Sequence, residues 1–236
     1  MQHLTFITWK NLYAVTSLTA RMLEELSLKL INHREMNGVK VLVLGFLAYY
    51  SLSNLLNQSV SLPKSLSIAI GVLWACISLG LAIAIYVKYQ RTAKVSARLW
   101  FAIIPIAIGL RILTNLITNI DTPELTPEGI VTTVLDWLEF IYAVLGAIAI
   151  APFIEETIFR LYLLPEKATN LDIVKNALLF AVIHPWVYDF KTTIRVLFAI
   201  FIIGLVLAYT MRKTNNFYLV MVLHGLINLF SFFTLD

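Results

Sequence analysis

Residues 193–211 read TIRVLFAIFIIGLVLAYTM, and this stretch decides the fold class of the chain. A membrane-spanning helix needs about 20 mostly apolar residues in succession. This stretch has about that length, and Arg195 is its one charged residue. The whole chain has the same character: 59% of its 236 residues are hydrophobic, only 14% are charged, and its mean hydropathy is +0.82. Soluble domains carry about 25% charged residues. We therefore expect an all-α protein, a polytopic transmembrane helical bundle.

Six further apolar segments predict the remaining helices, which makes about seven spans in all. They are residues 39–56, 66–87, 99–119, 130–164, 171–190 and 216–233. The segment 130–164 is too long for one span; Thr126 and Pro127 mark a helix start, and the span itself should lie near 140–164. Pro185 disfavours a helical conformation at His184, so the segment 171–190 should be kinked or broken there.

The first 37 residues differ from the rest of the chain because apolar and charged positions alternate at helical spacing. Leu23, Leu26 and Leu30 recur on one face with charged residues between them. This pattern is typical of an amphipathic helix, either on a membrane surface or packed on the bundle. We divide the chain into this N-terminal segment, residues 1–37, and a transmembrane bundle, residues 38–236. The single cysteine, Cys76, rules out an internal disulfide.

Basic residues are concentrated in some of the loops between the apolar segments. Lysine and arginine precede the first segment and recur in 88–98, 160–167 and 212–213, whereas the loop 119–129 is acidic. Because cytoplasmic loops carry the excess of lysine and arginine, we expect a cytoplasmic N-terminus and a C-terminus on the other side. This topology accounts for the formal net charge of +4, so no nucleic-acid partner is expected.

Three short motifs place polar side chains inside these apolar segments. They are EETIFR at 155–160, FAVIH at 180–184 and HGLIN at 224–228. A charge at bilayer depth costs roughly 2.5–3.5 kcal/mol, so such residues usually face a protein interior or a wet cavity. The helical rise places all three motifs about 12–20 Å from the cytoplasmic side. One site is therefore predicted from Glu155, Glu156, Arg160, His184, His224 and Asn228.

The spacing within the motifs suggests how these residues are arranged. Glu156 and Arg160 are four residues apart, which favours an ion pair on one helical face. Glu155 points about 100° away from Glu156, so it should face the cavity instead. His224 and Asn228 are also one turn apart and can reach the same group.

The ordered set Glu-Glu-x-x-x-Arg, Phe-x-x-x-His and His-x-x-x-Asn resembles the CPBP family. These are the CAAX-protease and bacteriocin-processing intramembrane endopeptidases, which include the Ras-converting CAAX endopeptidase. The resemblance covers about residues 146–233, including the stretches 204–207 and 212–214. Nothing in the first 125 residues adds to it.

The resemblance implies glutamate-type peptide hydrolysis without a covalent intermediate, metal or cofactor. Carried over by position, Glu155 and His184 would activate a water, and His224 and Asn228 would hold the scissile carbonyl and stabilise its oxyanion. Glu156, Arg160 and Phe180 would be supporting residues. The substrate would be a membrane-embedded or lipid-modified peptide or protein, cleaved in a lipid bilayer. We expect a multi-pass protein of the bacterial inner membrane.

Other classes of function remain open. A family member without activity could act as a membrane scaffold or binding protein. A proton-coupled transporter would also bury Glu, His and Arg, but the chain shows no inverted repeat of the kind that such carriers use. A zinc protease is disfavoured by the lack of His-Glu-x-x-His, although two histidines and a glutamate could still bind a metal.

Overall fold

The computed structural model describes residues 64–118, 144–184 and 190–231. Over these residues every regular element is a helix, which confirms the all-α prediction for this part of the chain. The predicted amphipathic segment 1–37 and the first predicted span, 39–56, lie outside the described residues. The count of seven spans therefore stays a prediction.

Eight helical elements lie in the described residues. Their bounds are α3 (Lys64–Lys88), α4 (Ala97–Thr118), η1 (Gly146–Ile150), α7 (Ala151–Glu156), η2 (Thr157–Leu163), α8 (Asn170–Val182), α9 (Phe190–Thr214) and α10 (Phe217–Ser231). The segments η1 and η2 are π-helical and continue into α7 from either side. Four predicted segments, 66–87, 99–119, 193–211 and 216–233, agree with α3, α4, α9 and α10 to within a few residues.

The fifth predicted segment, 171–190, is broken rather than merely kinked. Helix α8 ends at Val182, and the next helix begins at Phe190. The physical reason is Pro185, which excludes the helical conformation from the residue before it. Because α8 has 13 residues, it is only about 20 Å long and does not cross a hydrocarbon core of about 30 Å by itself.

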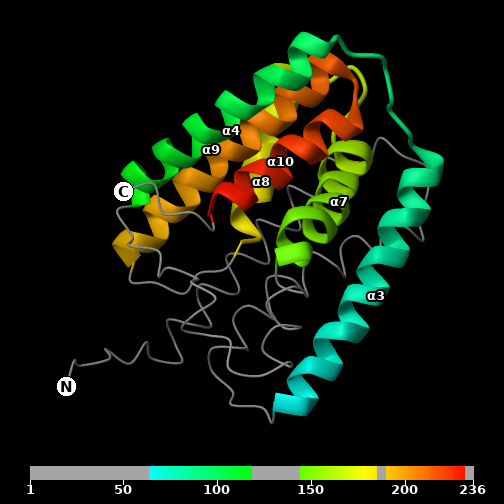
Figure 1. Ribbon diagram of the computed structural model, residues 1–236, viewed down its shortest axis with the longest axis vertical. Helices are drawn as coiled ribbons and strands as arrows, with labels where there is room; N and C mark the ends of the chain where they lie inside the picture. The colour runs from blue at the N-terminus through cyan, green and yellow to red at the C-terminus, as the bar shows by residue number, and fades with distance from the viewer. Residues whose placement is uncertain (1–63, 119–143, 185–189, 232–236) are drawn as a thin grey trace.

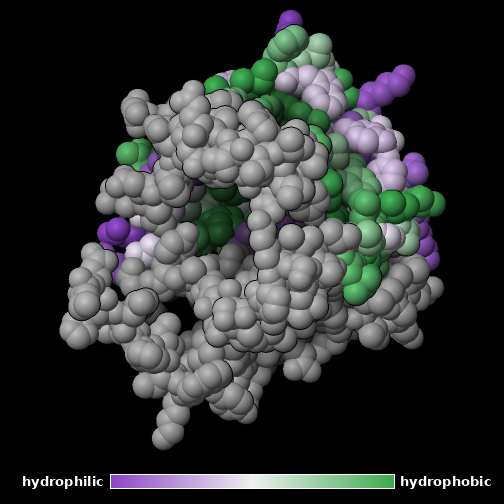
Figure 2. Space-filling view, turned by 60° about the horizontal axis from the view of Figure 1, so that its bottom comes forward, coloured by the Kyte–Doolittle hydropathy of each residue, from purple (hydrophilic) through white to green (hydrophobic). Residues whose placement is uncertain are grey.

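Two of the described helices are long and apolar enough to cross a membrane. They are residues Ala97–Thr118 of α4 and Lys191–Thr214 of α9. Two shorter apolar helices, Ala75–Lys88 and Phe217–Ser231, accompany them. Large apolar side chains are exposed on these helices, among them Val87 on α3, Phe101 on α4 and Phe198 on α9. Figure 2 shows such hydrophobic residues at the surface of the molecule. This exposure suits contact with lipid chains rather than water.

Helices α4, α9 and α10 run roughly side by side, with α8 packed against α9 (Figure 1). The continuous helix of η1, α7 and η2 packs against α10, and the C-terminal end of α3 contacts η2 and α7 while the rest of α3 stands apart (Figure 1). Two glycines allow close approach. A Cβ atom on Gly204 of α9 would lie 3.1 Å from the Cα of Ala177, and one on Gly225 of α10 would lie 2.5 Å from the carbonyl oxygen of Ile148. Small residues commonly permit such approach between membrane helices.

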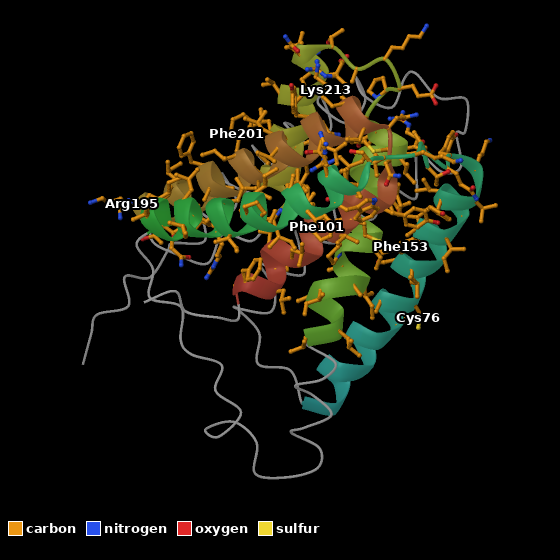
Figure 3. The ribbon with its side chains drawn as sticks, turned by 45° about the horizontal axis from the view of Figure 1, so that its top comes forward. Cys76, Phe101, Phe153, Arg195, Phe201 and Lys213 are labelled. Carbon is orange, nitrogen blue, oxygen red and sulfur yellow. The ribbon has the colours of Figure 1, made fainter. Side chains whose placement is uncertain are left out.

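Three connecting loops meet at one end of the bundle. The Arg91 guanidinium donates to the Leu164 carbonyl at 2.9 Å. The backbone N–H of Ala93 donates to Asn215, and that of Phe217 donates to Arg91. These loops are the ones predicted to lie on the basic, cytoplasmic side, together with the end of α9 that carries Lys213 (Figure 3).

Candidate active site

Glu155 and Glu156 lie in the short helix α7, between two π-helical segments. A π-helical turn inserts an extra residue, which shifts the direction of the side chains that follow, and such turns often occur at functional sites. Both glutamates are buried, with side chains 6% and 0% exposed. The carboxylates therefore point into the protein and not to its surface.

Glu156 bridges two partners with its two carboxylate oxygens. Its Oε2 lies 3.1 Å from Nε of Arg160, the ion pair that the four-residue spacing favours. Its Oε1 lies 2.8 Å from Nδ1 of His224. The second contact was not foreseen from the sequence, because no local spacing relates two residues on different helices. Glu156 thus positions a histidine of the predicted catalytic set in addition to pairing with Arg160.

The guanidinium of Arg160 is enclosed on all sides within the core. It donates to Oδ1 of Asn176 and, at 3.5 Å, to the carbonyl oxygen of Gly204. The ring of Phe180 lies 5.0 Å from the guanidinium carbon, within the range of a cation–π contact. Arg160 itself is 0% exposed. Its charge is therefore compensated by one carboxylate, two oxygen acceptors and an aromatic face.

Asn176 is a supporting residue that the sequence reasoning missed. Its Nδ2 donates to the Phe159 carbonyl at 2.8 Å while its Oδ1 accepts from Arg160. The sequence does contain a signal for it: Asn176, Phe180 and His184 are spaced by four residues, so the first two share the face of α8 that leads to His184. On that ground, Asn176 could have been included among the predicted supporting residues.

Glu155, His184 and His224 converge on one place. Oε2 of Glu155 lies 3.8 Å from Nε2 of His184 and 3.9 Å from Nε2 of His224. Both distances exceed those of a direct hydrogen bond. They are of the size that a bridging water or a reacting group spans. The predicted convergence of three motifs from separate helices is therefore present in the structure.

The ring of His184 is oriented by the end of its own helix. Its Nδ1 lies 2.6 Å from the carbonyl oxygen of Phe180. Helix α8 ends at Val182, so the carbonyls of its last turn lack helical partners and can accept other hydrogen bonds. Since a carbonyl only accepts, Nδ1 carries the proton. Nε2, the nitrogen that faces Glu155, is then a hydrogen-bond acceptor when the ring is neutral.

The ring of His224 is oriented by a carboxylate. Glu156 accepts at Nδ1, so Nδ1 carries a proton and Nε2 faces Glu155. In the neutral ring Nε2 accepts a hydrogen bond, and in the imidazolium form it donates one. Phe180 packs edge-on against this ring, with centroids 5.8 Å apart. Phe180 was predicted to be a supporting residue, and the structure places it between both histidines and Arg160.

Asn228 lies one turn beyond His224 on α10 but has a different hydrogen-bond partner. Its Nδ2 donates to the Ala147 carbonyl in η1 at 2.8 Å. Among the described residues, Asn228 makes no hydrogen bond to Glu155, His184 or His224. A carboxamide nitrogen carries two N–H groups, so the contact with Ala147 uses one of them.

The described part of the chain contains no group of three or more His, Cys, Asp or Glu side chains arranged to hold a metal ion. Within these residues the site contains two carboxylates, two imidazoles, the Arg160 guanidinium and the carboxamides of Asn176 and Asn228. They are organised by hydrogen bonds to one another and to backbone carbonyls.

Comparison with known proteins identifies one family. Residues 137–230 match the family described as Type II CAAX prenyl endopeptidase Rce1-like, and this range contains all three sequence motifs. No curated protein and no solved structure matched the chain. The match agrees with the resemblance that the motifs carry. Residues 137–230, less than half of the chain, are therefore similar to the Rce1-like domain of type II CAAX prenyl endopeptidases.

Proposed function

We propose that this protein is an intramembrane endopeptidase that hydrolyses a peptide bond near the membrane-proximal end of its substrate. The observation that carries the proposal is the approach of Glu155 Oε2 to Nε2 of both His184 and His224, at 3.8 and 3.9 Å. The matched family, which is a family of proteases, supports it.

In the proposed first step, Glu155 and His184 activate a water. Oε2 of Glu155 and Nε2 of His184 are both acceptors, and a water between them donates one hydrogen bond to each. Transfer of one proton to this pair leaves a hydroxide-like nucleophile beside the scissile carbonyl. A positioned general base typically accelerates such a step about 10²- to 10⁴-fold.

In the same proposal, His224 and Asn228 stabilise the oxyanion that forms on the carbonyl. His224 can donate from Nε2 when its ring is protonated, because Glu156 holds the proton on Nδ1. Two carboxylates then face two cations, Arg160 and the imidazolium, so the buried cluster is neutral. The second N–H of Asn228 supplies another donor. Loss of one such donor commonly lowers turnover about 10²- to 10³-fold.

We also propose the membrane setting of the reaction. The protein would be multi-pass with a cytoplasmic N-terminus, in a bacterial inner membrane, and its site would open toward the basic loops. The meeting of the loops around Arg91, Leu164 and Asn215 at one end of the bundle supports this orientation. The substrate would be a membrane-embedded or lipid-modified polypeptide, because prenylated CAAX proteins are the class that the family description names.

The test is hydrolysis of a farnesylated peptide with a CAAX terminus by the purified full chain in lipid vesicles. We expect cleavage that survives metal chelators and reagents directed at serine or cysteine. Glu155→Gln should abolish it, whereas the matched control Glu166→Gln, an exposed glutamate, should leave it unchanged.

Two results would contradict the proposal. Activity that is lost to a chelator and restored by zinc would indicate a metalloprotease. A folded wild-type protein that cleaves no membrane peptide, together with rescue of a deletion strain by Glu155→Ala, would indicate a scaffold.

A further inference from the structure

Arg111, in the middle of α4, is a buried cation outside the site described above. Arg111 is only 8% exposed. Its Nε and Nη2 atoms have no hydrogen-bond partner among the described residues. It lies at helical spacing from the buried residues Ile103 and Ala107, on the face of α4 that packs against α9 and α10. An unpartnered charge in such a place is costly. An anion bound next to Arg111 would compensate this buried charge.

None of the carboxylates in the described part of the chain serves this role. That part contains four. Glu155 and Glu156 are engaged with His184, His224 and Arg160. Glu166 is exposed on a loop, and Asp172 caps the start of α8.

The depth of Arg111 relates it to the proposed catalytic residues. Helices α4 and α10 begin at the same end of the bundle, where Phe217 donates to the Arg91 carbonyl and Thr92 pairs with Asn216. Arg111 is fourteen residues into α4, about 21 Å from this end, and His224 is seven residues into α10, about 10 Å from it. Arg111 thus lies on a helix that packs on α10, about 10 Å deeper than His224.

We propose that Arg111 binds the C-terminal carboxylate of the substrate, which makes it a specificity-determining residue. This inference rests on the proposed endopeptidase function. In a CAAX substrate three residues follow the prenylated cysteine. An extended tripeptide spans about 10 Å, which matches the offset in depth between His224 and Arg111. A guanidinium can bind a carboxylate through two parallel charge-assisted hydrogen bonds, and Nε and Nη2 form one such fork.

The experiment compares two farnesylated CAAX peptides that differ only at the terminus, a free carboxylate in one and a carboxamide in the other. Rates are measured with the full chain in phosphatidylcholine vesicles. The wild type should prefer the carboxylate on the order of 10- to 100-fold in kcat/KM, the size of a hydrogen bond to a charged group. Arg111→Gln should lower the carboxylate rate to the carboxamide rate and leave the latter unchanged. Arg111→Lys should keep part of the preference, and Arg98→Gln, an exposed arginine on the same helix, should keep all of it.

Binding to the Glu155→Gln protein separates this inference from the proposed function. A preference for the carboxylate peptide in binding, without hydrolysis by the wild type, would uphold the role of Arg111 and overturn the endopeptidase. Hydrolysis of both peptides at equal rates by the wild type would overturn the role of Arg111 and uphold the endopeptidase. An equal loss for both peptides in Arg111→Gln would show a structural residue. A loss that occurs only in vesicles containing anionic lipid would show that a lipid phosphate occupies the site. The wild-type comparison needs no variant, so a misfolded Arg111→Gln does not remove the test.

Discussion

The candidate site has two regions that differ in the distance between their charged groups and the nearest partners of those groups. In the supporting region Glu156, Arg160 and Asn176 contact one another and nearby carbonyls at hydrogen-bond distances. In the reactive region the Glu155 carboxylate stays 3.8 and 3.9 Å from the two histidines. The first region holds its charges in direct contacts, whereas the Glu155 carboxylate lies beyond hydrogen-bond distance from both imidazoles. This difference teaches that buried charge alone does not identify a catalytic residue.

His224 belongs to both regions. Its Nδ1 is held by Glu156 in the supporting region, and its Nε2 faces Glu155 in the reactive one. Partners of this kind fix the tautomer and the ring orientation of a functional histidine. The supporting region therefore fixes the direction of a ring that the proposed mechanism uses.

Replacing each of the two adjacent glutamates by glutamine, one at a time, is the strongest test of this comparison. Glu155→Gln should lower kcat on the order of 10³-fold or more, because it removes the proposed general base, and should leave the free energy of unfolding nearly unchanged. Glu156→Gln should cost about 3–5 kcal/mol of stability, because it leaves buried Arg160 without its carboxylate. Turnover by membrane vesicles and thermal unfolding measure the two effects. If Glu156→Gln were the variant with native stability and no activity, the two regions would have been assigned in reverse.

Removing the ring that joins the two regions should have the next largest effect. His224→Ala should lower kcat on the order of 10²-fold and change KM little, because an oxyanion donor acts mainly in the transition state. Steady-state kinetics with the farnesylated peptide measure this split. A rise in KM at constant kcat would instead make His224 a substrate-binding residue.

Asn176 tests whether the supporting region acts only through positioning. Asn176→Ala should cost about 1–3 kcal/mol of stability, because it leaves Arg160 and the Phe159 carbonyl short of a partner. It should lower kcat by roughly tenfold, since Arg160 then holds Glu156 and the His224 ring less firmly. The matched control is Asn170→Ala on the same helix, whose carboxamide bonds Arg212 at the surface. The two variants should differ in chemical unfolding and in rate, and equal effects would remove the special role of Asn176.

The smallest effect is expected where α10 touches η1. Gly225→Ala would place a Cβ atom 2.5 Å from the carbonyl oxygen of Ile148, so α10 must shift, at a cost of about 1–3 kcal/mol. Gly109→Ala on α4 is the control, because a Cβ there meets nothing within 4 Å. Thermal unfolding should separate the two. The same melting temperature for both would show that α10 and η1 pack less tightly than described.

The sequence could predict the helical segments because each carries its own signal. The apolar lengths of α4 and α9 and the break at Pro185 depend only on local composition and on the restriction that proline places on its neighbour. The spacing of Glu156 and Arg160 predicts their ion pair for the same reason, since both lie on one helix. Motif order was sufficient to name the family before any geometry was known.

Local signals could not predict the contacts that join separate helices. The bond between Glu156 and His224 crosses from α7 to α10, and the enclosure of Arg160 needs Asn176 from α8 and a carbonyl from α9. Glu155 and Glu156 also lie between two π-helical segments, which the residue pattern did not predict.

By itself, the sequence determined that this protein is helical, apolar enough for a membrane, and equipped with glutamate, histidine and asparagine in a particular order. Only the tertiary structure decided that Glu156 also holds the His224 ring, that Asn176 and the Gly204 carbonyl enclose Arg160, and that Nε and Nη2 of Arg111 have no hydrogen-bond partner among the described residues. The physical reason is that composition and periodicity act within one helix, whereas the neighbours of a buried charge come from whichever helices pack around it.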